Sequence, residues 1–257
     1  MTRLIERYDG VPLVAPALRE IPVEDNSAAL RFGARLVSER IDVLVLLTGI
    51  GTTTLFDILH SRHSTADIRS ALKETVMIAR GPKPVAALKA LGFTPTLTVP
   101  EPNTWVDVVS TLDEYRPVKG LHVAVQEYGV SNPDLLEALQ RRGADVFPVP
   151  VYKWALPEDT GPLKKVLEEI LRGRVSVLLI TNAAQIDHVM QLLERENKTA
   201  LFKEACKKMI VASIGPTASE RLRGYGLPID LEPSHSKMGI LVKETAERAR
   251  EILGGKR

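Results

Sequence analysis

The chain has 257 residues, of which 44% are hydrophobic and 26% are charged, and its 34 basic and 32 acidic side chains give a net charge of +2. This composition is typical of a globular protein of one or two domains and excludes a low-complexity chain or a strongly basic, nucleic-acid-binding one. The lone Cys206 excludes an internal disulfide. The polar start and the lack of an apolar run of about 18 residues favour a cytoplasmic protein.

Apolar runs of strand length recur along the chain and alternate with helical patterns. Candidate strands lie at 11–17, 41–47, 75–79, 94–100, 121–126, 145–152, 175–181, 209–214 and 228–233. Runs rich in Val, Leu and Ile are typical of strands that are covered on both faces, as in parallel sheets. Helical stripes at 135–143 and 162–173 each end in glycine, a common helix terminator. The sequence therefore predicts an α/β protein with parallel sheets.

One pattern occurs twice in the chain. Gly81-Pro82 and Gly215-Pro216 lie 134 residues apart, and each is followed by a leucine and then a glycine at the same spacing. The segments 43–59 and 176–193 form a second pair, each with an apolar strand, a threonine, a short turn and a helix. Two similarly wound α/β units are the simplest interpretation, with crossing points at the polar segments 20–26 and 152–161.

Each Gly-Pro step is a candidate anion site. Proline is favoured at the first position of a helix, and the free amides that follow it can bind an anion. The candidate donors are the amides of Lys83, Thr217 and Ala218. Because Pro84 has no amide hydrogen, the second copy is expected to bind the more firmly. The alternative is that each Gly-Pro step only starts a helix.

Three other features have two interpretations each. The segment 48–54, TGIGTTT, is either a nucleotide-binding loop or a tight strand-to-helix turn, and it lacks the third glycine of a dinucleotide motif. His60 and His63 are either half of a metal site or solvated surface side chains. Tyr128 and Tyr152 each follow a predicted strand, and each either packs as a half-buried ring or offers a phenol as a proton donor.

Several segments together resemble one family. RRGADVFPVPVYKWALPED (141–159), IGPTASERLRGYGL (214–227), the two strand–threonine–helix segments and VQEYGVSNPDLLEAL (125–139) stand in the order and spacing of the uroporphyrinogen-III synthases. Each motif alone is degenerate, but the match runs from near residue 1 to about residue 250.

The resemblance implies two similar, flavodoxin-like parallel-sheet domains joined by a two-stranded linker, with the active site in the cleft between them. Residues 1–20 and 156–257 would form a discontinuous domain, residues 26–150 the inserted domain, and residues 20–26 and 150–156 the linker strands. Family members begin with a strand, whereas Met1 falls inside the first expected helix. A central strand of the discontinuous domain is therefore expected to be absent.

The resemblance also implies a reaction. A lyase of this family closes the linear tetrapyrrole hydroxymethylbilane to uroporphyrinogen III, with inversion of ring D through a spiro intermediate and without a metal or other cofactor. The implied partner is hydroxymethylbilane, handed on by hydroxymethylbilane synthase, and the implied protein is a cytoplasmic monomer of tetrapyrrole (heme, siroheme, cobalamin) biosynthesis. Neither nucleic acid nor a membrane is expected to bind.

The family's functional residues map onto positions of this chain. Tyr152 matches the tyrosine that helps the hydroxyl group of the substrate to depart. The expected substrate-binding residues lie at the turns of both domains: Thr48, Gly49, Gly81, Lys83, Tyr128, Thr181, Asn182, Gly215, Pro216 and Thr217.

The chain departs from the family pattern at three of these turns. Gly49, Pro84 and Ala218 stand where family members often have hydroxyl side chains, so substrate binding is expected to depend more on backbone amides. Because these three hydroxyl side chains are lost, a second hypothesis stays open: the protein is a non-catalytic two-domain sensor that binds a tetrapyrrole or another polycarboxylate.

Overall fold

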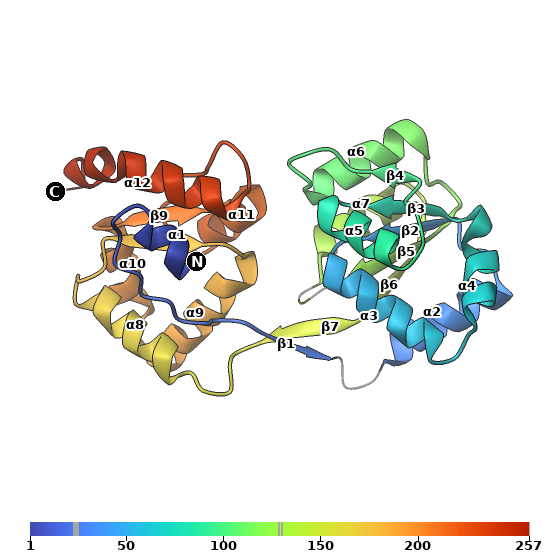
Figure 1. Cartoon of the computed structure of the whole chain (residues 1–257), viewed down its shortest axis with the longest axis horizontal. Helices are drawn as coiled ribbons and strands as arrows, with labels where there is room; N and C mark the ends of the chain where they lie inside the picture. Colours follow the sequence, from blue (N-terminus) through green and yellow to red (C-terminus); the bar gives the residue numbers. More distant parts are fainter. Residues whose placement is uncertain (23–25, 128, 130, 257) are drawn as a thin grey trace. The chain divides into compact units, whose positions relative to one another are not determined.

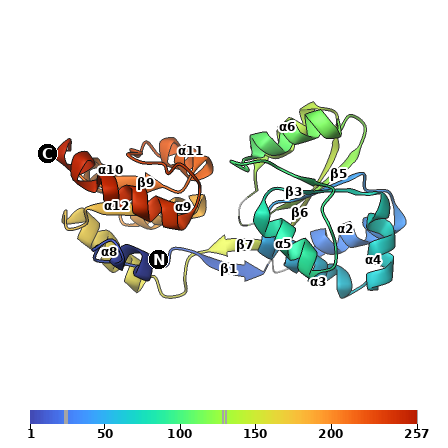
Figure 2. The ribbon, with the colours of Figure 1, turned by 45° about the horizontal axis from the view of Figure 1, so that its top comes forward.

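The chain divides into two compact units. The computed structural model describes residues 1–22, 26–127, 129 and 131–256. Unit 1 contains Met1–Arg19 and Ala155–Arg257, and unit 2 contains Glu20–Trp154 (Figure 1). The chain passes between the units through β1 (Arg19–Pro22) and β7 (Tyr152–Ala155), which pair with each other in a two-stranded sheet. These two strands lie side by side in both views of the ribbon (Figures 1 and 2).

Unit 2 contains a parallel sheet of five strands. Their order across the sheet is β4 (Leu97–Thr98), β3 (Val76–Ala79), β2 (Val43–Leu46), β5 (His122–Glu127) and β6 (Asp145–Pro150). The order is third, second, first, fourth, fifth along the unit, whereas a flavodoxin-like sheet has its second strand at the edge and its third beside its first. The flavodoxin-like label therefore does not fit this sheet, whose winding reverses between β2 and β5.

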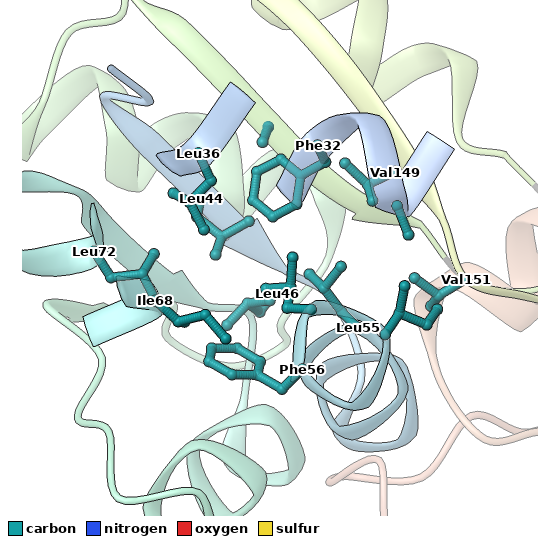
Figure 3. Packing of buried hydrophobic residues seen from close by; sticks show 14 of the residues in the cluster. Phe32, Leu36, Leu44, Leu46, Leu55, Phe56, Ile68, Leu72, Val149 and Val151 are labelled. Atoms are coloured by element: carbon teal, nitrogen blue, oxygen red, sulfur yellow. The ribbon is translucent and has the colours of Figure 1, made fainter. Parts of the chain in front are cut away.

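Helices cover both faces of this sheet (Figure 1). One face packs against α2 (Ser27–Ser38), α3 (Gly49–His60), α4 (Thr65–Ala71) and α5 (Pro82–Ala90), and the other against α6 (Trp105–Tyr115) and α7 (Pro133–Arg141); a short 3-10 turn, η1 (Leu72–Glu74), precedes β3. Phe32, Leu46 and Phe56 are fully buried in the first of these layers (Figure 3). The central strands β2 and β3 are apolar because helices cover both of their faces.

Unit 1 contains a smaller sheet. In the described residues it consists of β8 (Val177–Ile180) and β9 (Ile210–Ser213), paired in parallel, with one further bridge between Ala212 and Leu231. One face packs against α8 (Gly161–Leu171), α9 (Ala183–Arg195), α10 (Thr199–Lys207) and α11 (Pro216–Gly224), and the other against α12 (Met238–Gly254); α1 (Thr2–Glu6) contacts α12.

Three predicted strands are wrong or shortened. Residues 11–17 form no strand, residues 228–233 contribute only the bridge at Leu231, and 94–100 is a strand only at Leu97–Thr98. Each of these segments contains two prolines, which cannot donate a hydrogen bond to a sheet. The side chain of Val11 is 89% exposed, so this apolar run is not a core strand.

The predicted α/β class with parallel sheets is confirmed, and so is the duplicated helix start. α5 and α11 each begin at the proline of the Gly-Pro step, each has nine residues, and each is followed by a glycine with positive φ, +76° at Gly92 and +68° at Gly226. In the described part of the chain, none of the helices is both long and apolar enough to cross a membrane.

Candidate functional site

The carboxyl edge of the unit 2 sheet gathers several of the predicted site residues. Thr48 follows β2, Gly81 follows β3, and Tyr152 follows β6 after one residue. In open parallel sheets, ligands collect beyond the carboxyl ends of the strands where the winding reverses, because the loops diverge there. In this sheet that point lies between β2 and β5, directly beside Thr48.

Thr48 starts α3 and contacts the predicted catalytic tyrosine. It is the N-cap of the helix, and its Oγ1 accepts a hydrogen bond of 3.0 Å from the backbone amide of Gly51. The same Oγ1 lies 3.4 Å from the hydroxyl oxygen of Tyr152, where either group can donate. The capping bond fixes the threonine side chain, and the structure thereby brings together two hydroxyl groups that are 104 residues apart in sequence.

Tyr152 is held on several sides. Its side chain is only 6% exposed, and its ring meets the ring of Trp154 edge-on, with centroids 5.5 Å apart at an angle of 89°. Its carbonyl accepts a hydrogen bond of 3.0 Å from the amide of Gly129. The ring therefore packs in the core, while the hydroxyl group reaches the turn after β2.

Gln126 is a site residue that the sequence reasoning missed. Its side chain is fully buried at the end of β5, and its Oε1 accepts hydrogen bonds from the amides of Leu47 at 3.2 Å and Thr48 at 3.3 Å. Its Nε2 donates to the carbonyl of Glu127 at 2.5 Å. A glutamine at the end of the largely apolar run 121–126 was the available signal, because a buried polar group needs a partner.

The starts of α3 and α5 lie against each other. A Cβ atom built on Gly49 would approach the carbonyl oxygen of Lys83 to 2.9 Å, so glycine is needed for this close approach. Gly81 is the N-cap of α5, and a Cβ on it would lie 3.0 Å from Asn103. Since residues 82 and 84 are prolines, Lys83 alone offers an amide hydrogen in the first three positions of α5, and its side chain is exposed.

The equivalent edge of unit 1 is held by a local glutamine. Gln185 Oε1 accepts hydrogen bonds from the amides of Thr181 at 2.9 Å and Asn182 at 3.1 Å, and from Thr181 Oγ1 at 3.3 Å. Asn182 is the N-cap of α9, and its Oδ1 accepts from the amide of Ala184 at 2.9 Å. These bonds form a capping box, which satisfies the amides of the turn and of the first helical residues.

The second Gly-Pro step follows β9 and is held by hydrogen bonds of two buried serine side chains. Ser213 Oγ donates to the carbonyl of Gly215 at 3.1 Å and accepts from Ser219 Oγ at 2.9 Å, while Ser219 also contacts Glu232. Pro216 is the first residue of α11, and Thr217 after it is exposed. The first turn of α11 therefore offers the amides of Thr217 and Ala218, one more than α5 offers.

One known protein family matches almost the whole chain. The family model described as "Uroporphyrinogen-III synthase HemD" matches residues 1–243. The chain belongs to the uroporphyrinogen-III synthase family. Its fold is also that of the family's solved members: a mutant uroporphyrinogen III synthase of the extremely thermophilic bacterium Thermus thermophilus aligns with 97% of this chain and 93% of its own, at 24% identity and a TM-score of 0.71.

Two sequence relatives are each 27% identical to this chain. A protein of Methanothermobacter thermautotrophicus named "Putative uroporphyrinogen-III synthase" is 27% identical over 87% of this chain and 84% of its own length. The "Uncharacterized protein YjjA" of Bacillus subtilis is also 27% identical, over 96% of this chain and 90% of its own length.

The remaining predicted residues divide between the two units. At the carboxyl edge of the unit 2 sheet lie Thr48, Gly49, Gly81, Lys83 and Tyr152, and at that of unit 1 lie Thr181, Asn182, Gly215, Pro216 and Thr217. Tyr128 lies outside the described residues. The TGIGTTT segment is a strand-to-helix turn capped by Thr48. Among the described side chains, no group of three or more His, Cys, Asp or Glu residues could hold a metal ion. His60 is exposed at the end of α3, and His63 is half-buried in the connection to α4.

Proposed function

We propose that this protein is a uroporphyrinogen-III synthase, a lyase that closes hydroxymethylbilane to uroporphyrinogen III with inversion of ring D. Family membership supports the reaction class, and the contact between the hydroxyl groups of Thr48 and Tyr152 carries the proposal for this chain. A phenol held at the carboxyl edge of a parallel sheet, where the winding reverses, is suited to act on a bound ligand.

In this proposal Tyr152 is the proton donor to the departing hydroxyl group. As the carbon–oxygen bond of the substrate breaks, the phenol gives its proton to the oxygen, which leaves as water. Thr48 Oγ1 already accepts from Gly51, so its own hydrogen is available to stabilise the phenolate. Ring closure then releases a proton from a pyrrole carbon, which restores the phenol, so the net change is the loss of one water.

Substrate binding in this proposal relies on helix-start amides. Hydroxymethylbilane carries peripheral carboxylates, and the amides of Lys83, Thr217 and Ala218 stand at the starts of α5 and α11. An amide that binds a charged acceptor contributes about 1.5–3 kcal/mol. Since ring D must be turned over before closure, holding the carboxylates of the substrate contributes by orientation more than by covalent chemistry. The proposed place of the protein is directly after hydroxymethylbilane synthase in the cytoplasm, as a monomer.

The test supplies hydroxymethylbilane to the purified protein and separates the oxidised products by chromatography. We expect isomer III to be the main product, formed faster than the spontaneous closure that gives isomer I. Isomer I alone, at the uncatalysed rate, would contradict the proposal. Tetrapyrrole binding without isomer III would instead support the non-catalytic sensor.

A further inference from the structure

Gln126 extends the attachment of β2 to β5 beyond the end of the strand pair. The last paired residues are Leu46 and Gln126, and the next two amides of the β2 chain, those of Leu47 and Thr48, both bond to the side-chain oxygen of Gln126. A single buried side chain thus replaces the backbone acceptors that a longer strand would provide. The position of the Thr48 turn relative to β5 depends on this one amide group.

Gly51 makes room for this amide group. A Cβ atom on Gly51 would lie only 2.1 Å from Nε2 of Gln126, so the first turn of α3 packs directly on the glutamine. Gly51 also donates its own amide hydrogen to Thr48 Oγ1. Each of the three residues Gln126, Gly51 and Thr48 therefore contacts the other two. These contacts fix the position of Thr48 Oγ1, 3.4 Å from the hydroxyl oxygen of Tyr152.

We propose that Gln126, together with Gly51, is a positioning residue for the Thr48–Tyr152 pair. This inference rests on the proposed function, because it assigns Gln126 to the reaction through Tyr152. Gln126 touches no reacting atom in this scheme. It fixes the turn so that the threonine hydroxyl meets the phenol as the phenol loses its proton, and a displacement of such a group by about 1 Å can cost on the order of 100-fold in rate.

The test is a double-mutant cycle of Gln126→Met with Tyr152→Phe. Methionine keeps the length of the side chain but neither accepts from the two amides nor donates to Glu127. We expect Gln126→Met to lower kcat by about 10-fold or more, with KM changed by less than about 2-fold, because the lost interaction acts in the transition state. In the Tyr152→Phe protein the same change should cost little more, since the group that it positions is gone.

Two glutamines serve as comparison variants. Gln140→Met changes an exposed glutamine of α7 and should leave kcat and KM at the wild-type values. Gln185→Met loosens the equivalent turn of unit 1, where no described tyrosine hydroxyl bonds to Thr181, so its effect should multiply with that of Tyr152→Phe. If the effects of Gln126→Met and Tyr152→Phe also multiply, the positioning role is wrong.

A second measurement does not depend on activity. Hydrogen exchange of the amides of Leu47, Thr48 and Gly51 should accelerate by about 10-fold or more in Gln126→Met, because their acceptors are lost or displaced. Unchanged exchange would overturn the inference even if kcat fell. If the wild-type protein forms no isomer III, the proposed function fails alone, and this exchange measurement still decides whether Gln126 holds the turn.

Gly51→Ala provides an independent route if Gln126→Met does not fold. The added methyl group displaces the amide of Gln126 without removing it, so kcat and the three amide exchange rates should change in the same direction as in Gln126→Met. Like Gln126→Met, it should have little further effect in the Tyr152→Phe background. Full activity of Gly51→Ala, with wild-type exchange rates, would contradict the packing argument.

Discussion

The turns after β2 in unit 2 and after β8 in unit 1 are both held by a glutamine side chain, but this glutamine comes from a different element in each unit. In both, a glutamine Oε1 accepts hydrogen bonds from two consecutive backbone amides, at Leu47 and Thr48 in unit 2 and at Thr181 and Asn182 in unit 1. The glutamine of unit 1 comes from the helix that the turn itself begins, four residues after Thr181. The glutamine of unit 2 comes from the neighbouring strand, 78 residues after Thr48.

The unit 1 turn is bonded to its own helix, whereas the unit 2 turn is bonded to the neighbouring strand of the sheet. In unit 1 the capping box is complete within five residues, and Thr181 Oγ1 is bonded to Gln185. In unit 2 the long-range glutamine leaves Thr48 Oγ1 free to cap Gly51 and to meet Tyr152. We infer that the unit 2 turn is the chemical one and the unit 1 turn a binding one. The tyrosine and N-cap variants below test this assignment, and the cysteine and glycine variants compare the stability of the two units.

The largest expected effect is that of Tyr152→Phe. Loss of the phenol removes the proposed proton donor while the ring still packs against Trp154, so kcat should fall by about 100-fold or more with stability nearly retained. The matched change in unit 1 is Tyr225→Phe, which removes a hydrogen bond of 2.9 Å to Asp187 and should leave turnover unchanged. Steady-state kinetics with isomer analysis measures both. Equal kcat values for wild type and Tyr152→Phe would remove Tyr152 from the mechanism.

The second effect is confined to unit 1, which contains the only cysteine of the chain. Burial raises the pKa of the Cys206 thiol from 9.0 to about 12. Above pH 9 the unfolded chain loses this proton while the folded protein keeps it, so the free energy of unfolding falls as pH rises from 9 toward 12. At pH 10.5 the expected loss is about 2 kcal/mol.

Denaturant unfolding at pH 8 and pH 10.5 measures this loss in the wild type and in Cys206→Ala. The variant has a lower stability at both values, because the substitution leaves a small cavity, but it should lack the extra alkaline loss. Parallel pH dependence in the two proteins would show that the thiol is not responsible.

The third pair of changes compares the two N-caps, Thr48→Ala and Asn182→Ala. Each removes a side-chain acceptor for an amide of its helix, so each should lower the free energy of unfolding by about 1 kcal/mol. Of the two variants, Thr48→Ala should also lower kcat, since the Thr48 hydroxyl lies beside that of Tyr152, whereas Asn182→Ala should act through KM. Equal losses of kcat in the two variants would contradict the assignment of a chemical role to the unit 2 turn and a binding role to the unit 1 turn.

The smallest expected effect compares Gly81→Ala with Gly215→Ala. In both, an added Cβ meets a neighbouring side chain, Asn103 at 3.0 Å or Ser236 Oγ at 2.4 Å. With its side-chain amide turned so that the nitrogen donates to the carbonyls of Arg80 at 2.7 Å and Val99 at 3.0 Å, Asn103 is held in place, whereas Ser236 is exposed and can rotate away. Gly81→Ala should therefore be the less stable of the two by about 0.5 kcal/mol in thermal unfolding. The reverse order would contradict this account.

Much of the fold could be predicted from local pattern. The runs at 43–46, 76–79, 122–127, 177–180 and 210–213 are strands, as their mainly apolar composition indicates. The Gly-Pro steps start helices because glycine and proline have fixed roles at helix ends. The prediction is wrong at 11–17 and at 228–233, where each apolar segment contains two prolines and hydrophobicity alone does not form a strand.

The sequence by itself determined which residues end the strands and begin the helices, because those preferences act within one turn of chain. It thereby placed Thr48, Tyr152 and the Gly-Pro amides at loop positions. Only the tertiary structure decided that Gln126 bonds to the turn after β2 and that Thr48 meets Tyr152. Those contacts join strands far apart in sequence, and they exist because β5 pairs beside β2 in one register. A glutamine in an apolar strand does not reveal its partner until the neighbouring strand is known.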